Sequence, residues 1–87
     1  MTIRHKATAG TMQSSDAMIT VEPSDSLEIL IESTVRKQFE PLIREQVEAT
    51  LARLGVTTGR IHISDRGALD YALSARVETA IQRAHQE

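Results

Sequence analysis

The sequence predicts a small α+β fold in which two amphipathic helices pack on one face of a small β-sheet. Two patterns support this prediction. Apolar residues alternate with polar ones over residues 17–32 and again over 60–64, with the period of two that is typical of strands. Over residues 35–54 and 68–84 the apolar residues follow three-and-four spacing, which is typical of helices. The predicted order is (β)ββ-α-β-α, a two-layer sandwich whose second sheet face stays free.

Length and composition limit the classes of protein that remain. The chain has 87 residues, of which 40% are apolar and 25% charged, so one globular domain spanning residues 1–87 is expected. The net charge of −2 and the aromatic content of 2% argue against nucleic-acid binding. The absence of cysteine excludes disulfides and thiolate chemistry. No apolar run approaches the roughly 18 residues of a membrane span, and we expect a soluble cytoplasmic protein. A flexible N-terminus over residues 1–8 is one interpretation, which the sequence leaves open.

Two strands are predicted on either side of a turn at Pro23-Ser24-Asp25. Residues 7–14 are a weaker candidate for an extra edge strand, because Gly10 disfavours a strand interior. The apolar faces of the two main strands consist of alternating residues: Ala17, Ile19 and Val21 in the first, and Leu27, Ile29 and Ile31 in the second.

The first predicted helix ends at Gly55, which suits the position after a helix C-terminus. Pro41 is compatible only with a first helical turn, so we expect the helix to begin near Gln38, with residues 34–38 as a turn or short helical lead-in. The spacing that predicts this helix involves Val35, Phe39, Leu42, Ile43, Gln46, Val47, Thr50, Leu51 and Leu54.

A short strand and a last helix complete the prediction. Ile61 and Ile63 lie on the buried side of the strand, and Ser64 or Asp65 is expected to cap the helix that follows. The apolar stripe of that helix comprises Ala68, Leu69, Ala72, Leu73, Arg76 (through its aliphatic stem), Val77, Ala80, Ile81 and Ala84.

No group of residues predicts catalysis or metal binding. The three histidines have neither HxH nor HExxH spacing, so solvated side chains are the simpler interpretation. Ser14, His62 and Asp16 could be combined into a triad, but their spacing does not support one and no G-x-S-x-G turn is present.

An acidic stretch runs from the end of the first predicted strand, through the turn, and along the second predicted strand. Its members are Glu22, Asp25, Glu28 and Glu32. Because they alternate with apolar residues, a solvated strand face is the favoured interpretation, and a docking surface for a basic partner is the alternative. The triplet Asp25-Ser26-Leu27 matches the one at which four-helix carriers hold phosphopantetheine. Here it leads into a predicted strand instead of a helix, which argues against that role.

A stretch of small and hydroxylated residues precedes the first main strand. Together with four later stretches it forms a series of short motifs along the chain. In order they are Ala9-Gly10-Thr11-Met12-Gln13-Ser14-Ser15-Asp16, continued by Met18 and Ile19, then Val35-Arg36-Lys37-Gln38-Phe39, Leu51-Ala52-Arg53, Asp65-Arg66-Gly67-Ala68-Leu69-Asp70 and Leu73-Ser74-Ala75-Arg76-Val77-Glu78. With this pattern the chain resembles the acyl carrier subunit, or gamma subunit, of citrate lyase over nearly its whole length.

The resemblance implies a site of covalent attachment. The serine of Gly-Thr-x-x-Ser-x-Asp, here Ser14, would carry 2′-(5″-triphosphoribosyl)-3′-dephospho-coenzyme A through a phosphodiester, with Gly10, Thr11 and Asp16 as the supporting motif. Ser15 stands where a glycine is expected, so two adjacent hydroxyls compete, and the register favours Ser14. A modifying holo-synthase must reach this hydroxyl, which argues for a loop or hairpin tip near residues 13–16.

The resemblance also implies a role without catalysis of its own. The chain would carry an acetyl or citryl thioester between the alpha (transferase) and beta (lyase) subunits of a complex that cleaves citrate to acetate and oxaloacetate. Two alternatives remain open at this point. One is the carrier subunit of malonate decarboxylase, and the other is an unmodified structural or adaptor subunit.

Overall fold

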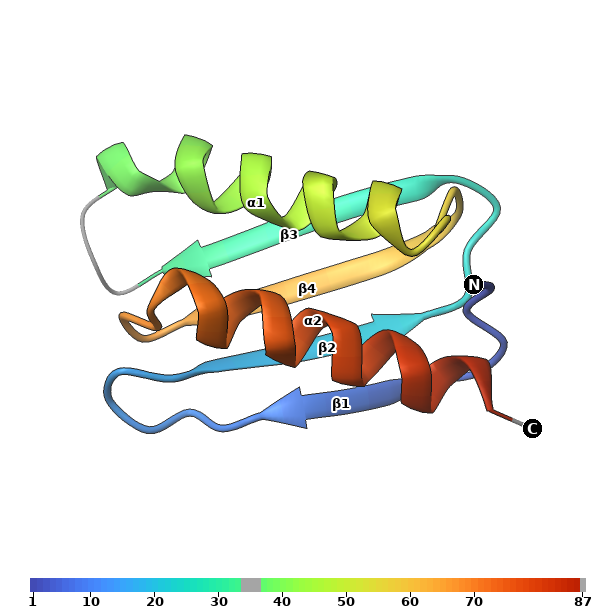
Figure 1. Cartoon of the computed structure of the whole chain (residues 1–87), viewed down its shortest axis with the longest axis horizontal. Coiled ribbons are helices and arrows are strands. Elements are labelled where there is room, and N and C mark those ends of the chain that lie inside the picture. The colour runs from blue at the N-terminus through green and yellow to red at the C-terminus, as the bar shows by residue number, and fades with distance from the viewer. Residues whose placement is uncertain (34–36, 87) are drawn as a thin grey trace.

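The predicted fold class and order are confirmed by the computed structural model, which describes residues 1–33 and 37–86 (Figure 1). The elements in chain order are β1 (Ala7–Gly10), β2 (Ala17–Glu22), β3 (Leu27–Ser33), a 3₁₀ turn η1 (Lys37–Phe39), α1 (Glu40–Arg53), β4 (Gly59–Asp65) and α2 (Asp70–His85). The additional edge strand is therefore present, over a shorter range than 7–14. Val35 of the first predicted helical stripe and residues 34–36 of its lead-in lie outside the described residues.

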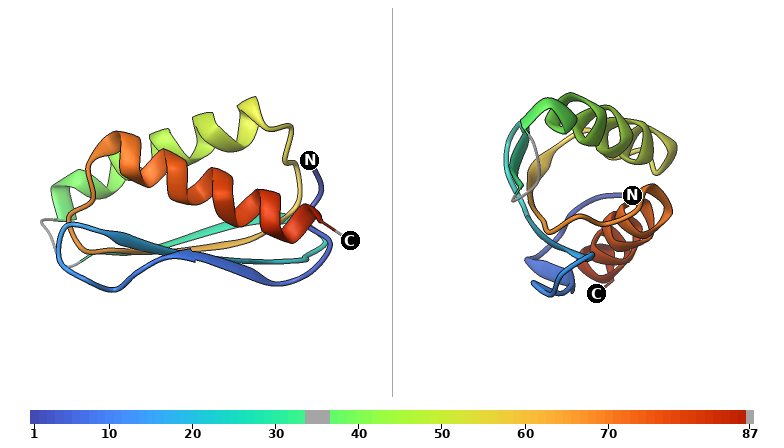
Figure 2. Two further views of the ribbon diagram at one scale, coloured as in Figure 1. Left: turned by 60° about the horizontal axis from the view of Figure 1, so that its bottom comes forward. Right: turned by 90° about the vertical axis from the view of Figure 1, so that its left-hand side faces the viewer.

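The sheet has the strand order β1-β2-β4-β3, so the last strand in the sequence lies between two earlier ones. The pairs β1–β2 and β2–β4 are antiparallel, whereas β3 and β4 are parallel. Parallel neighbours need a crossover connection, and α1 supplies it. Both helices lie on the same side of the sheet, and the opposite face is uncovered (Figure 2).

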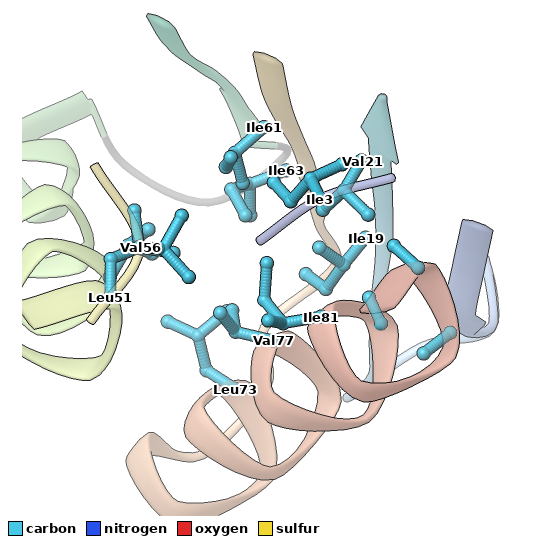
Figure 3. Close-up of a cluster of buried hydrophobic side chains, with 14 of the residues drawn as sticks. Ile3, Ile19, Val21, Leu51, Val56, Ile61, Ile63, Leu73, Val77 and Ile81 are labelled. Atoms are coloured by element: carbon cyan, nitrogen blue, oxygen red, sulfur yellow. The ribbon is translucent and has the colours of Figure 1, made fainter. Parts of the chain in front are cut away.

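The core lies between the sheet and the helices. Ile19, Val21, Ile61 and Ile63 of β2 and β4 face Leu73, Val77 and Ile81 of α2, and Val47 and Leu51 of α1 complete the layer (Figure 3). These buried residues match the predicted apolar faces. The expectation for Leu27 was wrong, because this side chain is 41% exposed. It begins an edge strand that has only one neighbouring strand, so packing from that side is missing.

The limits of α1 confirm the prediction from its proline and glycine. The helix begins at Glu40, which leaves Pro41 in the first turn, where its missing N–H removes no helical hydrogen bond. At the other end Gly55 has a φ of +70°. The N–H groups of Gly55 and Val56 donate to the carbonyls of Ala52 and Leu51 at 3.1 and 2.9 Å, which is a Schellman motif.

The predicted start of the last helix was wrong. Ser64 and Asp65 belong to β4, and α2 begins only at Asp70, because the chain must first rise from the sheet to the helix layer. The Asp65 carboxylate instead accepts N–H groups of Gly67 and Ala68, at 3.3 and 3.0 Å, and so holds the turn between strand and helix. Leu69 was also misplaced in the apolar stripe, since it precedes the helix and is 60% exposed.

The first six residues close one end of the sandwich. Ile3 is buried against the core. The Met1 ammonium donates to the Leu54 carbonyl at 2.5 Å, and the N–H groups of Arg4 and His5 donate to the Ala84 carbonyl at 2.9 and 3.3 Å. These contacts lie at the end opposite the loop between β1 and β2 (Figure 1). The flexibility of residues 1–8 in solution stays a prediction.

Candidate attachment site on the loop between β1 and β2

The loop that contains Ser14 joins two paired strands. Gly10 of β1 lies opposite Met18 of β2, so residues 11–16 form the connection. Gly10 has a φ of +86°, and a Cβ atom at this position would lie 1.8 Å from the carbonyl oxygen of Ala17. A side chain is therefore excluded at Gly10, and the two ends of the loop can approach closely only with glycine there.

Asp16 connects the loop to itself and to α2. Its carboxylate accepts the hydroxyl of Thr11 at 2.6 Å, the N–H of Ala17 at 2.7 Å and the Nε of Arg76 at 3.2 Å. The Thr11 hydroxyl, followed by the Ala17 N–H and Arg76, lowers the pKa of Asp16 to about 2. The carboxylate is thus charged at neutral pH and is held by a cation of the same chain, with its side chain only 16% exposed.

The back of the loop is bonded to the turn between β4 and α2. The N–H of Ser15 donates to the Arg66 carbonyl at 2.8 Å, and the N–H of Arg66 donates to the Asp16 carbonyl at 2.8 Å. A further bond from the N–H of Asp16 to the Gln13 carbonyl, at 3.2 Å, tightens the turn over residues 13–16. Two of the stretches that carry the family resemblance, far apart in sequence, therefore lie side by side.

Ser14 and Ser15 are both exposed, so exposure alone does not distinguish them. Their backbones differ. Ser15 has a φ of +65° and is the one residue other than glycine with a positive φ in the described part of the chain. Glycine adopts this conformation without strain, which explains why a glycine is expected at position 15.

Two contacts that hold the loop were not found by sequence reasoning. Arg66 holds the loop through its backbone, for which the sequence carries no signal. Arg76 was placed in the apolar stripe of α2 because of its stem, and its guanidinium pairs with Asp16, 60 residues away. An arginine within an apolar stripe can bury its stem while its charged head stays available for a carboxylate, as Arg76 does with Asp16.

The other chemical candidates do not assemble into a site. His62 pairs with Glu32 at 3.1 Å on the uncovered sheet face, whereas the Asp16 carboxylate faces Thr11 and Arg76, so no triad with Ser14 forms. Among residues 1–33 and 37–86 no group of three potential ligands could hold a metal ion. In the same part of the chain no helix combines the length and apolar character needed to cross a membrane.

Glu22, Glu28 and Glu32 of the acidic stretch lie on the uncovered sheet face and contact Arg60 or His62 of β4, whereas Asp25 lies in the turn between β2 and β3. Arg60 contacts Glu28 at 2.8 Å and Glu22 at 3.0 Å, and both carboxylates raise the pKa of the guanidinium. This arrangement agrees with a solvated strand face. Ser26 directly precedes β3, so the Asp25-Ser26-Leu27 triplet does not start a helix as it does in the four-helix carriers.

The fold and the loop together define a class of protein. A small α+β domain displays an exposed, hydroxyl-bearing loop on a fixed base, and its described residues contain no triad or metal-binding group. Functional residues are often carried by exposed loops on a rigid scaffold. A family model described as "ACP: Malonate decarboxylase delta subunit (MdcD)" matches residues 4–84. The chain belongs to this family of acyl carrier proteins.

Several curated relatives, all citrate lyase acyl carrier proteins, are similar to this chain over nearly its whole length. The citrate lyase acyl carrier protein of Haemophilus influenzae (strain PittEE) is 48% identical over 87 residues, which covers 100% of this chain and 92% of the relative. That of Halothermothrix orenii is 47% identical over 85 residues, covering 97% and 90%. A chain of a Pseudomonas malonate decarboxylase hetero-tetramer, crystallised in complex with malonate, superposes with a TM-score of 0.83 at 21% identity, covering 94% of this chain and 86% of that one. The latter likeness shows a shared fold.

Proposed function

We propose that this chain is the acyl carrier subunit of a cytoplasmic citrate lyase complex, with the prosthetic group attached through a phosphodiester to Ser14. The observation that carries the proposal is the exposed loop hydroxyl of Ser14, at the motif position, in a chain 48% identical to a citrate lyase acyl carrier protein. The chain itself catalyses no step. Its role is to carry an acyl group to the active sites of the alpha (transferase) and beta (lyase) subunits.

The residues around Ser14 fit a bulky nucleotide-based group. Ser14 lies in an exposed turn, so a holo-synthase can approach its hydroxyl and the group can extend into solvent. The nearby carboxylate of Asp16 is already paired with Arg76, which reduces its repulsion of phosphates. When attached, 2′-(5″-triphosphoribosyl)-3′-dephospho-coenzyme A supplies the thiol that forms the thioester.

The physical contribution of the domain is tethering. A flexible arm keeps its end at an effective concentration of about a millimolar near any site within reach. The bonds of the loop to Arg66 and Arg76 fix where that arm leaves the domain, because they tie residues 15 and 16 to the turn after β4 and to α2. The base of the arm is thus set by a folded scaffold.

The attachment site can be tested by intact mass and peptide mapping after co-expression with the holo-synthase. We expect an adduct on Ser14 in the wild type and in Ser15→Ala, and none in Ser14→Ala. Since the two serines are adjacent and both exposed, this pair is a matched control. An adduct that survives in Ser14→Ala rejects the site, and a wild type without any adduct rejects the carrier function.

A malonate decarboxylase carrier is the second candidate, favoured by the description of the family model and by the TM-score of 0.83. Reconstitution of the modified chain with either set of catalytic subunits separates the two, because only the matching set should turn over its substrate. An unmodified adaptor subunit would instead support complex activity equally well with Ser14→Ala.

A further inference from the structure

We propose that the end of the sandwich carrying Ser14 is the docking face for the catalytic subunits, and that the groove between the starts of α1 and α2 receives an apolar side chain flanked by Lys or Arg residues of such a subunit. This inference rests on the proposed carrier function, since it assumes partners that must approach the attached group. It adds the surface and the chemistry by which they would recognise the chain.

Exposed apolar side chains gather at this end. Of the eight exposed large apolar residues in the described part of the chain, five come from three segments at this end: the loop between β1 and β2, the start of α1 with its preceding turn, and the start of α2 with the residue before it (Figures 1 and 2). They form the Ser14-end patch, which consists of Met12, Phe39, Leu42, Leu69 and Tyr71. Two of them, Phe39 and Leu42, line the same hollow, and exposed apolar side chains around a hollow are a common feature of interaction sites.

A groove of about 570 Å³ lies within this end, between the two helices. Phe39, Leu42 and Ile43 of α1 and its preceding turn line one wall, and Leu73 of α2 lines the other. Gln46 also lines it and joins the helices, since its amide donates to the Asp70 carbonyl and to the Ser74 hydroxyl, the latter at 2.7 Å. The groove is therefore already formed in the free chain and is large enough for one or two side chains.

Among the residues that the structure describes, the charged ones that line the groove are all acidic: Glu45, Asp65 and Asp70. Asp65 is buried and already accepts bonds from the Ser33 hydroxyl and from the following turn. Glu45 and Asp70 are exposed and belong to different helices, so a carboxylate stands on each side of an apolar floor. This arrangement favours an apolar side chain with cationic neighbours, and it disfavours the polyanionic prosthetic group itself.

The other surfaces of the domain are less suited to docking. On each edge strand a carbonyl is bonded by an arginine of the covering helix, from Arg44 to Ile29 at 3.3 Å and from Arg83 to Thr8 at 2.7 Å. Such contacts hinder pairing with a further strand. On the uncovered sheet face, the guanidinium of Arg60 is already paired with the carboxylates of Glu22 and Glu28, so these charges are less available to a partner.

The groove and Ser14 are close enough to act together. Ser15 is bonded to Arg66, and the next residue, Gly67, lines the groove. Ser14 is the chain neighbour of Ser15, and Gly67 is the chain neighbour of Arg66. Two Cα–Cα steps along the chain and one hydrogen-bonded residue pair therefore separate Ser14 from Gly67, which limits their Cα distance to about 13 Å. A subunit held at the groove would therefore have Ser14 at the margin of its own contact surface.

Titration calorimetry of the full chain with the citrate lyase transferase subunit tests the inference, with equal modification of all samples confirmed by intact mass. We expect Leu42→Arg to raise the Kd at least tenfold and Glu45→Lys several-fold. The matched controls are Leu30→Arg, which replaces a leucine of similar exposure (53% against 59%) on the sheet face, and Glu48→Lys, one turn along α1. Both controls should change the Kd less than twofold.

Three results would overturn the docking face. They are an unchanged Kd for both Leu42→Arg and Glu45→Lys, an equal loss for Leu30→Arg, and no binding of the wild type. Circular dichroism of each variant separates weakened docking from unfolding. Because Leu42 and Glu45 are both exposed, we expect both groove variants to fold. The carrier function is decided separately by the adduct on Ser14, so an adduct without groove-dependent binding refutes this inference alone.

Discussion

The two ends of the sandwich are closed in different ways. At the N-terminal end six residues lie across the layers, where Ile3 is buried and Met1 is bonded to Leu54. At the Ser14 end the large side chains of Phe39, Leu42 and Tyr71 stay exposed. Small domains always expose part of their apolar surface. At the N-terminal end the short segment covers part of the core, and two large apolar side chains, Met1 and Leu27, are 41% exposed there. Five are exposed at the Ser14 end, so the exposure in the described part of the chain is greater at that end.

The forces that hold the two ends differ as well. At the N-terminal end Ile3 packs into the core, and Met1, Arg4 and His5 donate hydrogen bonds to backbone carbonyls of α2 and of the end of α1. At the Ser14 end the loop depends on a charged carboxylate, that of Asp16, and on backbone bonds to Arg66. Substitutions and pH should therefore affect the two ends in different ways, and the following predictions use this difference.

The largest effect is expected for Gly10→Ala. Its Cβ would lie 1.8 Å from the Ala17 carbonyl oxygen at a φ of +86°, so strand pairing at the base of the loop must shift. We expect a loss of about 3 kcal/mol in the free energy of unfolding, measured by urea denaturation. The matched control is Gly55→Ala at the N-terminal end, where φ is +70° but the nearest atom is 3.5 Å away. It should lose only about 1 kcal/mol. Equal losses would contradict the steric explanation.

The next effect concerns apolar packing. Ile3→Ala leaves a cavity at the closed end and should lower the free energy of unfolding by about 2 to 3 kcal/mol. Leu42→Ala at the Ser14 end removes a side chain that is 59% exposed and should change it by less than about 0.5 kcal/mol. Urea denaturation of both variants gives the comparison. A large loss for Leu42→Ala would mean that the Ser14-end patch contributes to folding and is not reserved for a partner.

The features that sequence reasoning predicted correctly depend on neighbouring residues. Pro41 and Gly55 determine the limits of α1 through local backbone geometry, and the alternation along β2 and β4 gives the buried face of the sheet. The helix start proposed at Ser64 or Asp65 failed because a short polar residue after a strand can hold a turn as well as a helix cap. Composition does not separate these two roles.

The features that could not be predicted depend on residues far apart in the chain. The position of β4 between β2 and β3 follows from the packing of both helices together, and no single stretch contains it. For the candidate site, the small residues and the family pattern pointed to an exposed loop at residues 13–16. Its attachment through Arg66 and Arg76 arises only when the strands pair. The fold class was therefore accessible from sequence, but the support of the site was not.

A smaller effect, dependent on pH, is expected at Asp16. Its pKa in the folded chain is about 2, below the ordinary value of 3.8, so its contacts stabilise the fold fully above about pH 4 and lose this contribution as the pH falls through 2. Asp16→Asn should therefore be less stable than wild type at pH 7, and the difference should shrink towards zero as the pH falls through 2. Urea denaturation at several pH values measures it.

Thr11→Val provides the control for this pH dependence. The Thr11 hydroxyl makes the largest contribution to the low pKa of Asp16, so the Asp16→Asn difference should shrink when it is measured in the Thr11→Val background. A difference that stays constant from pH 7 to pH 2 would show that the carboxylate acts through shape and not through its charge.

The smallest effect is expected at Ser15 and joins the stability of the loop to its function. Ser15→Gly relieves the strain of a φ of +65° in the folded chain, but it also raises the conformational entropy of the unfolded chain. The free energy of unfolding should therefore rise by only about 0.5 kcal/mol. The same substitution at Ser14, where φ is not positive, should lower it slightly. After co-expression with the holo-synthase, Ser15→Gly should keep its adduct and Ser14→Gly should lose it. If Ser15→Gly were unmodified, the hydroxyl at position 15 would be the attachment point. If it were less stable than the wild type, the conformational explanation of that residue would fail.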